Sequence, residues 1–524
     1  MRIEFIVPVN QDIEQLKSSV QENFSAHLEP VRTVYRTHYD SFDWRLYKKN
    51  SLLEDTRDGN EHILVWKTLQ GENYCPRMKL REIPQFAWDL PKGPFRDLLT
   101  MVLEMRELTP RVRVRSKIHV LRILNKDEKT VSRLIIQENN LQRQRGIRSG
   151  KIDNRATIVP VRGYAKPSME VARFLEQQGL IPTQDDLMMT ALTTIGASPG
   201  DYSTKLLLTL DPTMRADRTM KIILRRLFDI MLVNEDGTRT GTDTEFLHDF
   251  RVAIRRTRSA LSQVKAVFPK QVLDRYKREF AWLGQITSPG RDLDVYLLNF
   301  DEYRDNLPGG MQAHIEPMRD FLIKQQGIEH KALIKAMNSQ RYRRILLHWP
   351  AFLDEPVKER STLKNARQPI INVARKRIWR IYRGILRNGG LITPGTPAEV
   401  LHDLRKDCKK LRYMMEFFRS LFAEEHIEQL TRMLKSLQTN LGNHQDYDVQ
   451  IKSLNQIGSQ MQAEGNATPE TLLAMAMLIE GLQAKLQQTR SEFAIQFGTF
   501  AAKENRKLFR KLFANAQESQ KILQ

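Results

Sequence analysis

The chain has 524 residues, more than one hydrophobic core accommodates, so we expect at least two domains. Hydrophobic residues make up 41% of the sequence and charged residues 28%, which is typical of globular proteins and excludes wholesale disorder. The 83 lysine and arginine residues outnumber the 62 aspartate and glutamate residues, and the net charge of +21 favours an anionic partner, although such a charge also serves solubility.

The cysteines and the apolar segments bear on the compartment. Cys75 and Cys408 lie far apart and neither has a Cys or His cluster around it, so the sequence predicts no disulfide framework and no structural zinc site. The apolar run at residues 3–9 contains a charge, and no window approaches the roughly 18 uninterrupted apolar residues of a spanning helix. We therefore expect a reducing, cytoplasmic location, with neither secretion nor membrane insertion.

Residues 1–160 have the pattern of a β-rich domain. Short runs rich in β-branched and aromatic residues are separated by Asp, Gly, Asn or Pro. They predict strands at residues 3–9, 31–39, 62–69, 101–107, 111–124 and 131–137. Helices are expected at residues 11–28 and 167–178, and the Ala-Ser-Pro-Gly cluster at residues 197–200 predicts a linker.

From residue 201 onward the pattern changes to apolar residues at spacings of three and four, which is typical of helices. Pro and Gly clusters predict breaks between the helices at residues 289–290, 308–310 and 389–397. This half is predicted to be a helical bundle.

The helical half contains an internal repeat. Residues 247–258 read LHDFRVAIRRTR and residues 401–412 read LHDLRKDCKKLR, at an offset of 154 residues. GRDLDV follows the first motif and HQDYDV the second, and the distances from His248 to Asp294 and from His402 to Asp448 are both 46 residues. We therefore expect two copies of one helical unit, at about residues 201–350 and 355–515.

Each repeated motif places cations on one side of a helix. His248, Arg251, Arg255 and Arg258 are spaced by three, four and three residues, so they share an arc of about 80°. The second repeat has the same pattern, and each helix has apolar residues on its other side. The basic residues of the second repeat are His402, Arg405, Lys409 and Arg412. The apolar residues are Phe250, Ala253, Ile254 and Leu261 in the first repeat, and Leu404, Cys408, Leu411 and Met415 in the second.

A single basic stripe is usually a solvated helix face. Here the neighbouring cations repel one another, almost no carboxylates share their side of the helix, and the stripe occurs twice. A groove lined by both repeats and occupied by an anion explains all three observations.

Further cations extend this pattern. Arg218, Lys221 and Arg225 are spaced by three and four residues, and a second stripe consists of Lys376, Arg380, Arg383 and Arg387. The distribution fits a long polyanion such as polyphosphate, or nucleic acid. Nucleic acid would also require exposed aromatic residues for stacking, and for Trp379 and Tyr382 we favour a place in the core.

The paired motifs, with GRDLDV and HQDYDV after them, resemble the two halves of a CHAD domain over residues 201–515. This resemblance implies an all-α domain of two four-helix bundles around a basic cavity that binds inorganic polyphosphate. Asp292, Asp294, Asp446 and Asp448 could be metal ligands, but we favour structural roles for them. The resemblance implies polyphosphate contacts at His248, Arg251, Arg255, Arg256, Arg258, His402, Arg405, Lys409, Lys410 and Arg412, to which the charge pattern adds Arg218, Lys221, Arg225, Lys376 and Arg380.

Residues 1–195 resemble a CYTH domain, the triphosphate tunnel fold, which implies an antiparallel β-tunnel or barrel. The resemblance rests on YDSFDWRL at residues 39–46, LVWK at 64–67, KLRE at 79–82, and the alternating Arg111, Arg113 and Arg115. The alternation places the three arginines on one face of a strand, with Val112 and Val114 on the other. The candidate anion-binding residues of the tunnel are Arg45, Lys67, Arg81, Arg111, Arg113 and Arg115.

The first strand departs from the catalytic CYTH pattern, Glu-x-Glu-x-Lys, whose carboxylates help to hold a divalent metal. The strand reads RIEFIVP, so if Glu4 is the first glutamate, Ile6 and Pro8 replace the second glutamate and the lysine; if it is the second, Arg2 replaces the first. Either alignment loses a metal ligand, although Glu82, Glu104 and Glu138 lie on later strands. We therefore expect a degenerate tunnel and assign no catalytic residue.

The sequence thus predicts a multidomain α+β protein that binds inorganic polyphosphate through its helical half. The resemblance implies a bacterial protein associated with polyphosphate granules. Binding itself should require no cofactor and no membrane. One alternative is a metal-dependent inorganic triphosphatase in the tunnel, which would require magnesium or manganese. Another is a general binder of nucleic acid or other polyanions.

Overall fold

The computed structural model describes residues 3–69, 76–142 and 150–514. Arg2 and Cys75, which entered the predictions above, lie outside the described residues. The contacts divide the chain into unit 1, residues 1–203, and unit 2, residues 204–524, each of which is described by itself below.

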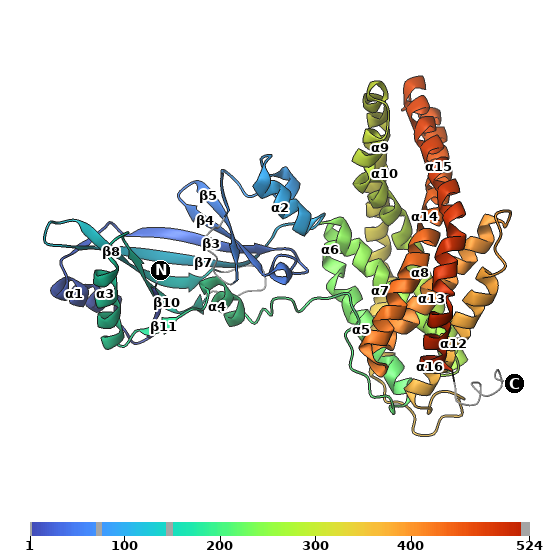
Figure 1. The fold of residues 1–524 in the computed structure, drawn as a ribbon, viewed down its shortest axis with the longest axis horizontal. Helices are drawn as coiled ribbons and strands as arrows, with labels where there is room; N and C mark the ends of the chain where they lie inside the picture. The colour runs from blue at the N-terminus through green and yellow to red at the C-terminus, as the bar shows by residue number, and fades with distance from the viewer. Residues whose placement is uncertain (1–2, 70–75, 143–149, 515–524) are drawn as a thin grey trace. The chain divides into compact units, whose positions relative to one another are not determined.

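Unit 1 is a β-sheet with helices packed against it (Figure 1). Its strands are β1 (Ile3–Val7), β2 (Ala26–Leu28), β3 (Arg32–Asp40), β4 (Ser51–Asp58), β5 (Glu61–Thr68), β6 (Arg77–Leu80), β7 (Thr109–Leu124), β8 (Thr130–Leu141), β9 (Gly150–Lys151), β10 (Asn154–Pro160) and β11 (Ile181–Thr183). Its helices are α1 (Ile13–Asn23), η1 (Tyr47–Lys49), η2 (Ala87–Asp89), α2 (Pro94–Leu103), α3 (Ala165–Gln177) and α4 (Leu187–Thr194).

The sheet is antiparallel, which confirms the fold predicted for this half. The described strands follow the order β11-β1-β10-β8-β7-β3-β4-β5-β6, with β2 on β7 and β9 on β8. This hydrogen-bonded order runs from one edge to the other, and no described strand pair closes it into a ring.

Three apolar clusters fix the helices on the sheet. α1 and α3 pack together against β1, β7, β8 and β10 around Leu16 and Val171. α2 and η2 cover Leu53 and Leu64, and α4 covers Val112 of β7. From Val112 to Ile118 every second residue of β7 is buried, as the alternation predicted, whereas Ile118 to Leu121 are all buried.

One predicted strand is wrong, and one predicted helix is shorter than expected. Residues 101–107 are not a strand but the end of α2 and the turn after it, because the apolar residues Leu99 and Leu103 recur at helical spacing and pack in the core. The helix predicted at residues 11–28 ends at Asn23, where the chain turns back to form β2 beside β7.

Unit 2 is helical throughout, which confirms the predicted bundle. Its elements are α5 (Ala216–Val233), α6 (Glu235–Thr240), α7 (Thr244–Gln263), α8 (Lys270–Leu298), α9 (Phe300–Asp305), η3 (Gly309–Ile315), α10 (Glu316–Met337), α11 (Gln340–Asp354), α12 (Ile370–Gly389), α13 (Ala398–Phe417), η4 (Arg419–Leu421), α14 (Glu424–Ala463), α15 (Pro469–Phe500) and α16 (Lys503–Phe513).

Two apolar clusters organise unit 2. The larger one joins helices of both repeats, and Phe250 of α7 and Leu411 of α13 both belong to it. The smaller one joins Met318 of α10 to Leu454 of α14 and Met475 of α15, where these helices extend beyond the main bundle (Figure 1). The two repeats therefore share one core.

The break predicted at residues 289–290 is wrong, because α8 continues through Pro289. A proline inside a helix costs about 3 kcal/mol, and α8 is held on both sides of it by core packing, at Leu283 in the larger cluster and at Tyr296 in the smaller one. The other two predicted breaks are confirmed, since α9 ends before residues 308–310 and α13 begins after Pro397. Among the described residues, no helix is long and apolar enough to cross a membrane.

Candidate anion-binding site

Two contacting helices, α7 and α13, carry the repeated basic motifs. α7 begins after Asp243, whose side chain accepts hydrogen bonds from the backbone nitrogens of Glu245 and Phe246, and α13 begins after Pro397. The apolar side predicted for each helix is buried, so the basic residues point away from the core. The buried residues are Phe250, Ala253, Ile254 and Leu261 on α7, and Leu404, Cys408, Leu411 and Met415 on α13.

Arg255 connects the two basic motifs. Its Nε donates a hydrogen bond to the hydroxyl of Tyr413 on α13, at 2.6 Å. Its positive charge lowers the pKa of Arg405 and Lys409 on α13, and that of Arg251 on its own helix. The charge of Arg258 also lowers the pKa of Arg251, and the charge of Arg412 lowers that of Lys409. We call the resulting group the α7–α13 cluster: Arg251, Arg255, Arg258, Arg405, Lys409 and Arg412.

The pKa values of the cluster reflect crowded positive charge. Burial, together with the guanidinium groups of Arg405 and Arg255, lowers the pKa of Lys409 to about 8. Burial also lowers the pKa of Arg251 and of Arg405, and in both cases Arg255 adds to the effect. With a pKa of about 8, Lys409 is mostly protonated at neutral pH and loses its proton as the pH rises above that value. A bound anion would favour the charged form of every member.

Few carboxylates neutralise the cluster. Asp446 accepts a hydrogen bond from Arg405 at 2.9 Å, and Glu416 lies 3.3 Å from Arg412. In the part of the chain that the structure describes, neither Arg258 nor Lys409 has an ion pair or a hydrogen bond with another side chain. The cluster therefore keeps an excess of positive charge.

Helix α8 supports the cluster from one side. Nη1 of Arg251 donates to the hydroxyls of Thr287 at 3.0 Å and Ser288 at 2.9 Å. Arg258 passes over Gly284, where an added Cβ would lie 2.7 Å from its Nη1. A glycine at this position lets the guanidinium of Arg258 approach the α8 backbone.

Four other predicted contacts lie on the same two helices. Nη2 of Arg256 is held by Glu416 at 3.1 Å, and Lys410 by Asp407 at 2.8 Å. His402 is hydrogen-bonded to the side chain of Gln445, and His248 is half-buried on α7. These residues flank the cluster and have protein partners of their own.

The structure does not bring Arg218, Lys221 and Arg225 into the cluster. They line a separate cavity of about 690 Å³ between α5 and the end of α11. Lys221 donates to the backbone carbonyls of Phe352 and Glu355, and Arg225 lies 3.3 Å from Asp354. Two of the three cations are therefore used to hold the end of α11 against α5.

Lys376 and Arg380 lie on an exposed side of α12, also outside the cluster. Arg377, which sequence reasoning missed, is hydrogen-bonded to Gln263 at the end of α7. Burial, followed by the charge of Arg380, lowers the pKa of Arg377. Arg377 thus lies between α7 and the exposed side of α12.

Sequence reasoning also missed Tyr413 and Arg291. Tyr413 follows the second motif directly, but an aromatic residue there predicts core packing, and its hydroxyl meets Arg255 only in the folded structure. Arg291 is the first residue of the RDLDV segment of the first repeat, and its charge lowers the pKa of Arg251. Because Arg291 lies in a repeated segment, the sequence could have indicated it as a site residue.

Three of the four aspartates after the motifs contact other side chains. Asp446 accepts from Arg405, Asp448 lies 2.8 Å from Lys452, and the buried Asp294 accepts a hydrogen bond from Gln326 of α10. The negative charge of Asp292 favours the charged form of Arg251 and so opposes the lowering of its pKa by burial. Over residues 3–69, 76–142 and 150–514, no group of three or more His, Cys, Asp or Glu side chains is arranged to hold a metal ion.

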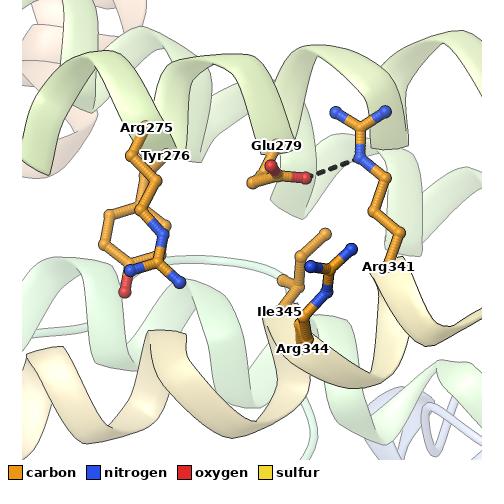
Figure 2. A pocket seen from close by; sticks show the side chains of 6 residues that line it. All are labelled: Arg275, Tyr276, Glu279, Arg341, Arg344 and Ile345. Atoms are coloured by element: carbon orange, nitrogen blue, oxygen red, sulfur yellow. Dashed lines mark hydrogen bonds and ion pairs between the residues drawn. The ribbon is translucent and has the colours of Figure 1, made fainter.

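A smaller cavity of about 180 Å³ lies between α8 and α11 (Figure 2). Glu279 accepts a hydrogen bond from Nε of Arg341 at 2.7 Å, and Arg341 also lies over the ring of Trp282. None of the residues that line it belongs to the α7–α13 cluster. The cavity is thus separate from the cluster. Its lining residues are Arg275, Tyr276, Glu279, Arg341, Arg344 and Ile345.

In unit 1 the predicted tunnel arginines have separate surroundings. Arg111 stacks 3.8 Å over the ring of Trp44, while Arg113 and Arg115 are exposed. Arg45 is held by Asp43 and Glu104, and Arg81 is exposed. They do not converge on one site.

Cations and polar groups do meet on the opposite face of this sheet, where Lys67 lies. Nζ of Lys67 donates to Glu54 at 2.8 Å, and Arg36 donates to Gln137 at 3.0 Å. Burial by itself raises the pKa of Glu54, and the charge of Lys67 is the largest of the effects that lower it. Of these residues the sequence indicated only Lys67. The buried face is polar, but its lysine is already neutralised by a carboxylate.

The glutamates considered as metal ligands do not fit a divalent metal site. Glu4 faces Thr157, Glu104 pairs with Arg45, and Glu138 accepts from His119 at 2.7 Å. Glu82 is exposed and lines a cavity that none of the other three glutamates lines. Each glutamate has its own surroundings, so together they form no ligand set.

Several solved structures match part of the chain. A CHAD domain from the plant Ricinus communis is 23% identical, with a TM-score of 0.47, over 56% of this chain and 94% of that one. The protein PptA from Streptomyces chartreusis is 16% identical, with a TM-score of 0.43, over 55% of this chain and 99% of that one. A protein from Hippeastrum, described as revealing a dominant triphosphatase activity, is 12% identical, with a TM-score of 0.26, over 38% of this chain and 99% of that one.

No curated protein matches the chain. The family model of the CHAD domain matches residues 222–455, which include both basic motifs and the segments that follow them. The match begins within α5 and ends within α14. Unit 2 therefore contains a CHAD domain.

Proposed function

We propose that the protein binds inorganic polyphosphate at the α7–α13 cluster. One observation carries the proposal: Arg255 brings the cations of both repeats together, and few carboxylates compensate them. A protein rarely holds such a group together unless a ligand supplies the missing negative charge. The CHAD domain supports the choice of a phosphate chain.

The mechanism of binding is electrostatic. Successive phosphates would accept charge-assisted hydrogen bonds from Arg251, Arg255 and Arg258 on one side and from Arg405, Lys409 and Arg412 on the other. Release of condensed counterions makes such binding weaken steeply as salt is added. Binding in this form requires no cofactor. Association with polyphosphate granules would follow from the same contacts.

Nucleic acid is the less favoured ligand for this site. Stacking on exposed aromatic rings strengthens binding to single strands. The aromatic residue nearest the cluster, Tyr413, is 3% exposed and offers its hydroxyl to Arg255. A phosphate chain needs no such ring.

We assign no hydrolytic function to unit 1. Its candidate carboxylates are dispersed, and Lys67 is neutralised by Glu54. A metal-dependent triphosphatase would need both a ligand set and a free cationic face. Phosphate release from triphosphate with magnesium or manganese, abolished by a chelator, would show this assignment to be wrong.

Binding of labelled long-chain polyphosphate by the full-length protein, over a series of salt concentrations, tests the proposal. We expect a variant with Arg251, Arg255, Arg405 and Lys409 replaced by alanine to lose binding. A control variant with Arg275, Arg278, Arg343 and Arg344 replaced by alanine removes the same charge from α8 and α11 and should bind nearly as the parent does. Circular dichroism verifies that both variants fold. Equal affinity of the two variants would contradict the proposed site.

A further inference from the structure

Helix α12 has an exposed basic face. Lys376, Arg380, Arg383 and Arg387 are exposed and recur at spacings of four, three and four residues, so they share one side of the helix. The opposite side is buried around Ile378. The sequence of α12 contains no aspartate or glutamate. The like charges repel at these spacings, and no carboxylate of the helix offsets them.

Helix α16 repeats this arrangement. It has five basic residues and one acidic residue, Glu504, in 11 positions. Phe509 and Phe513 are buried, whereas Lys503, Arg506, Lys507 and Lys511 are exposed. The helix lies beyond the residues that match the CHAD domain, which end at 455.

The two helices pack through their apolar sides, so their basic sides remain outside. The ring of Tyr382 on α12 stacks on that of Phe509 with centroids 3.7 Å apart. Burial raises the pKa of Tyr382, and the charge of Arg506 on α16 opposes that rise. Arg506 therefore lies at the boundary with α12. We call the exposed basic sides of the two helices, taken together, the α12–α16 face: Lys376, Arg380, Arg383, Arg387, Lys503, Arg506, Lys507 and Lys511.

The α12–α16 face has no acidic partners. Within the described ranges, none of its eight cations forms an ion pair with an aspartate or glutamate. By contrast, Arg419, on the nearby η4, is held by both Glu424 and Glu428. Glu504 is the one acidic residue of α12 and α16; it is exposed beside the cations of α16 and, among the described residues, forms no ion pair with those of the face.

Arg377 lies between this face and the α7–α13 cluster. It is hydrogen-bonded to Gln263 of α7, and its pKa responds to Arg380 of the face. A polyanion leaving the cluster along the end of α7 would therefore meet Arg377 before it reached the exposed cations of α12.

We propose that the α12–α16 face is a second contact surface for long inorganic polyphosphate chains, in addition to the α7–α13 cluster. The proposal rests on the function proposed above. A short chain would occupy the cluster alone, whereas a long chain would engage both surfaces and bind more tightly by that multiple contact.

The chemistry of the face favours a phosphate chain over other polyanions. Its aromatic residues are buried or half-buried, so no exposed ring on α12 or α16 is available for stacking of bases. The apolar side of α16 is used up in packing against α12, so the helix cannot insert that side into a lipid surface.

The test compares short-chain and long-chain polyphosphate on four full-length proteins over a salt series. They are the parent, the cluster variant described above, a face variant with Arg380, Arg383, Lys507 and Lys511 replaced by alanine, and the α8–α11 control variant, which loses the same four charges. We expect the face variant to bind short chains like the parent and long chains at least about tenfold more weakly. The slope of log affinity against log salt for long chains should become shallower by about three, since each lost phosphate contact contributes roughly 0.7.

A variant that exchanges these four residues between Arg and Lys keeps the charge and should restore long-chain binding. Long-chain affinity equal to that of the control variant would overturn the inference, as would equal displacement by RNA. Failure of the proposed function gives a different result, because the cluster variant would then retain short chains. The two failures are therefore distinguishable.

Discussion

Nε of Arg255 on α7 lies 2.6 Å from the hydroxyl of Tyr413 on α13, so one hydrogen bond joins the two repeats at the centre of the cationic cluster. Tyr413 is buried, and its ring lies 5.4 Å from the guanidinium carbon of Arg412. One aromatic residue thus positions an arginine from each repeat.

Replacing Tyr413 by phenylalanine removes the acceptor and leaves the ring. We expect the free energy of unfolding to fall by about 1 kcal/mol, which is the usual net contribution of such a bond. Polyphosphate affinity should fall severalfold, because Arg255 loses its fixed orientation. Chemical denaturation and polyphosphate titration measure the two effects. Unchanged affinity would mean that the ligand itself orients Arg255.

The pKa of Lys409, about 8, predicts opposite pH effects on binding and on stability. Polyphosphate affinity should fall as pH rises through 8, since the bound anion requires the protonated amine. Stability of the free protein should rise over the same range, because the unfolded chain keeps the lysine proton up to its ordinary pKa of 10.5 and the folded chain does not. Titrations at fixed ionic strength test both. In the Lys409→Arg variant, neither trend should be centred on pH 8.

Glu416 neutralises both Arg256 and Arg412, at 3.1 and 3.3 Å. The Glu416→Gln variant should bind polyphosphate more tightly at low salt by a few fold, since an opposing charge beside the cluster is lost. Its stability should fall by up to about 1 kcal/mol, as for a partly exposed ion pair. Glu279→Gln, which breaks the pair in the cavity between α8 and α11, serves as the control and should leave affinity unchanged.

Two glycines of α12 predict opposite effects of alanine. An added Cβ at Gly389 would lie 2.1 Å from the ring of Phe497, so Gly389→Ala should destabilise the protein by about 1–3 kcal/mol. A Cβ at Gly384 meets nothing within 4 Å, and Gly384→Ala should stabilise by about 0.5–1 kcal/mol, because alanine favours the helix. Thermal unfolding of the two variants decides the matter. Destabilisation by Gly384→Ala would show that this position is more crowded than described.

The pair of Glu54 and Lys67 predicts a non-additive effect in unit 1. Glu54→Gln leaves Lys67 partly buried without its partner and should cost about 2 kcal/mol or more. Adding Lys67→Met should recover part of that loss, since the unpaired charge is gone. Calorimetry on the single and double variants measures the coupling. A purely additive result would contradict an interaction between the two side chains.

The elements that depend on short-range periodicity were predictable from the amino-acid sequence. Alternation of Arg113 and Val114 defined β7, and spacing of three and four residues defined the buried and basic sides of α7 and α13. The repeat at an offset of 154 residues identified the equivalent helices. Such patterns are legible because side-chain direction follows directly from the local backbone.

Which cations share one site was not predictable in this way, because it depends on the packing of distant helices. Arg218 and Arg251 have the same residue type and similar helical spacing, yet one lines a cavity beside α11 and the other joins the α7–α13 cluster. The partners that decide this come from distant segments: Thr287 for Arg251 and Tyr413 for Arg255. Periodicity within one helix gives the direction of a side chain, whereas its partner depends on how separate helices pack through the core.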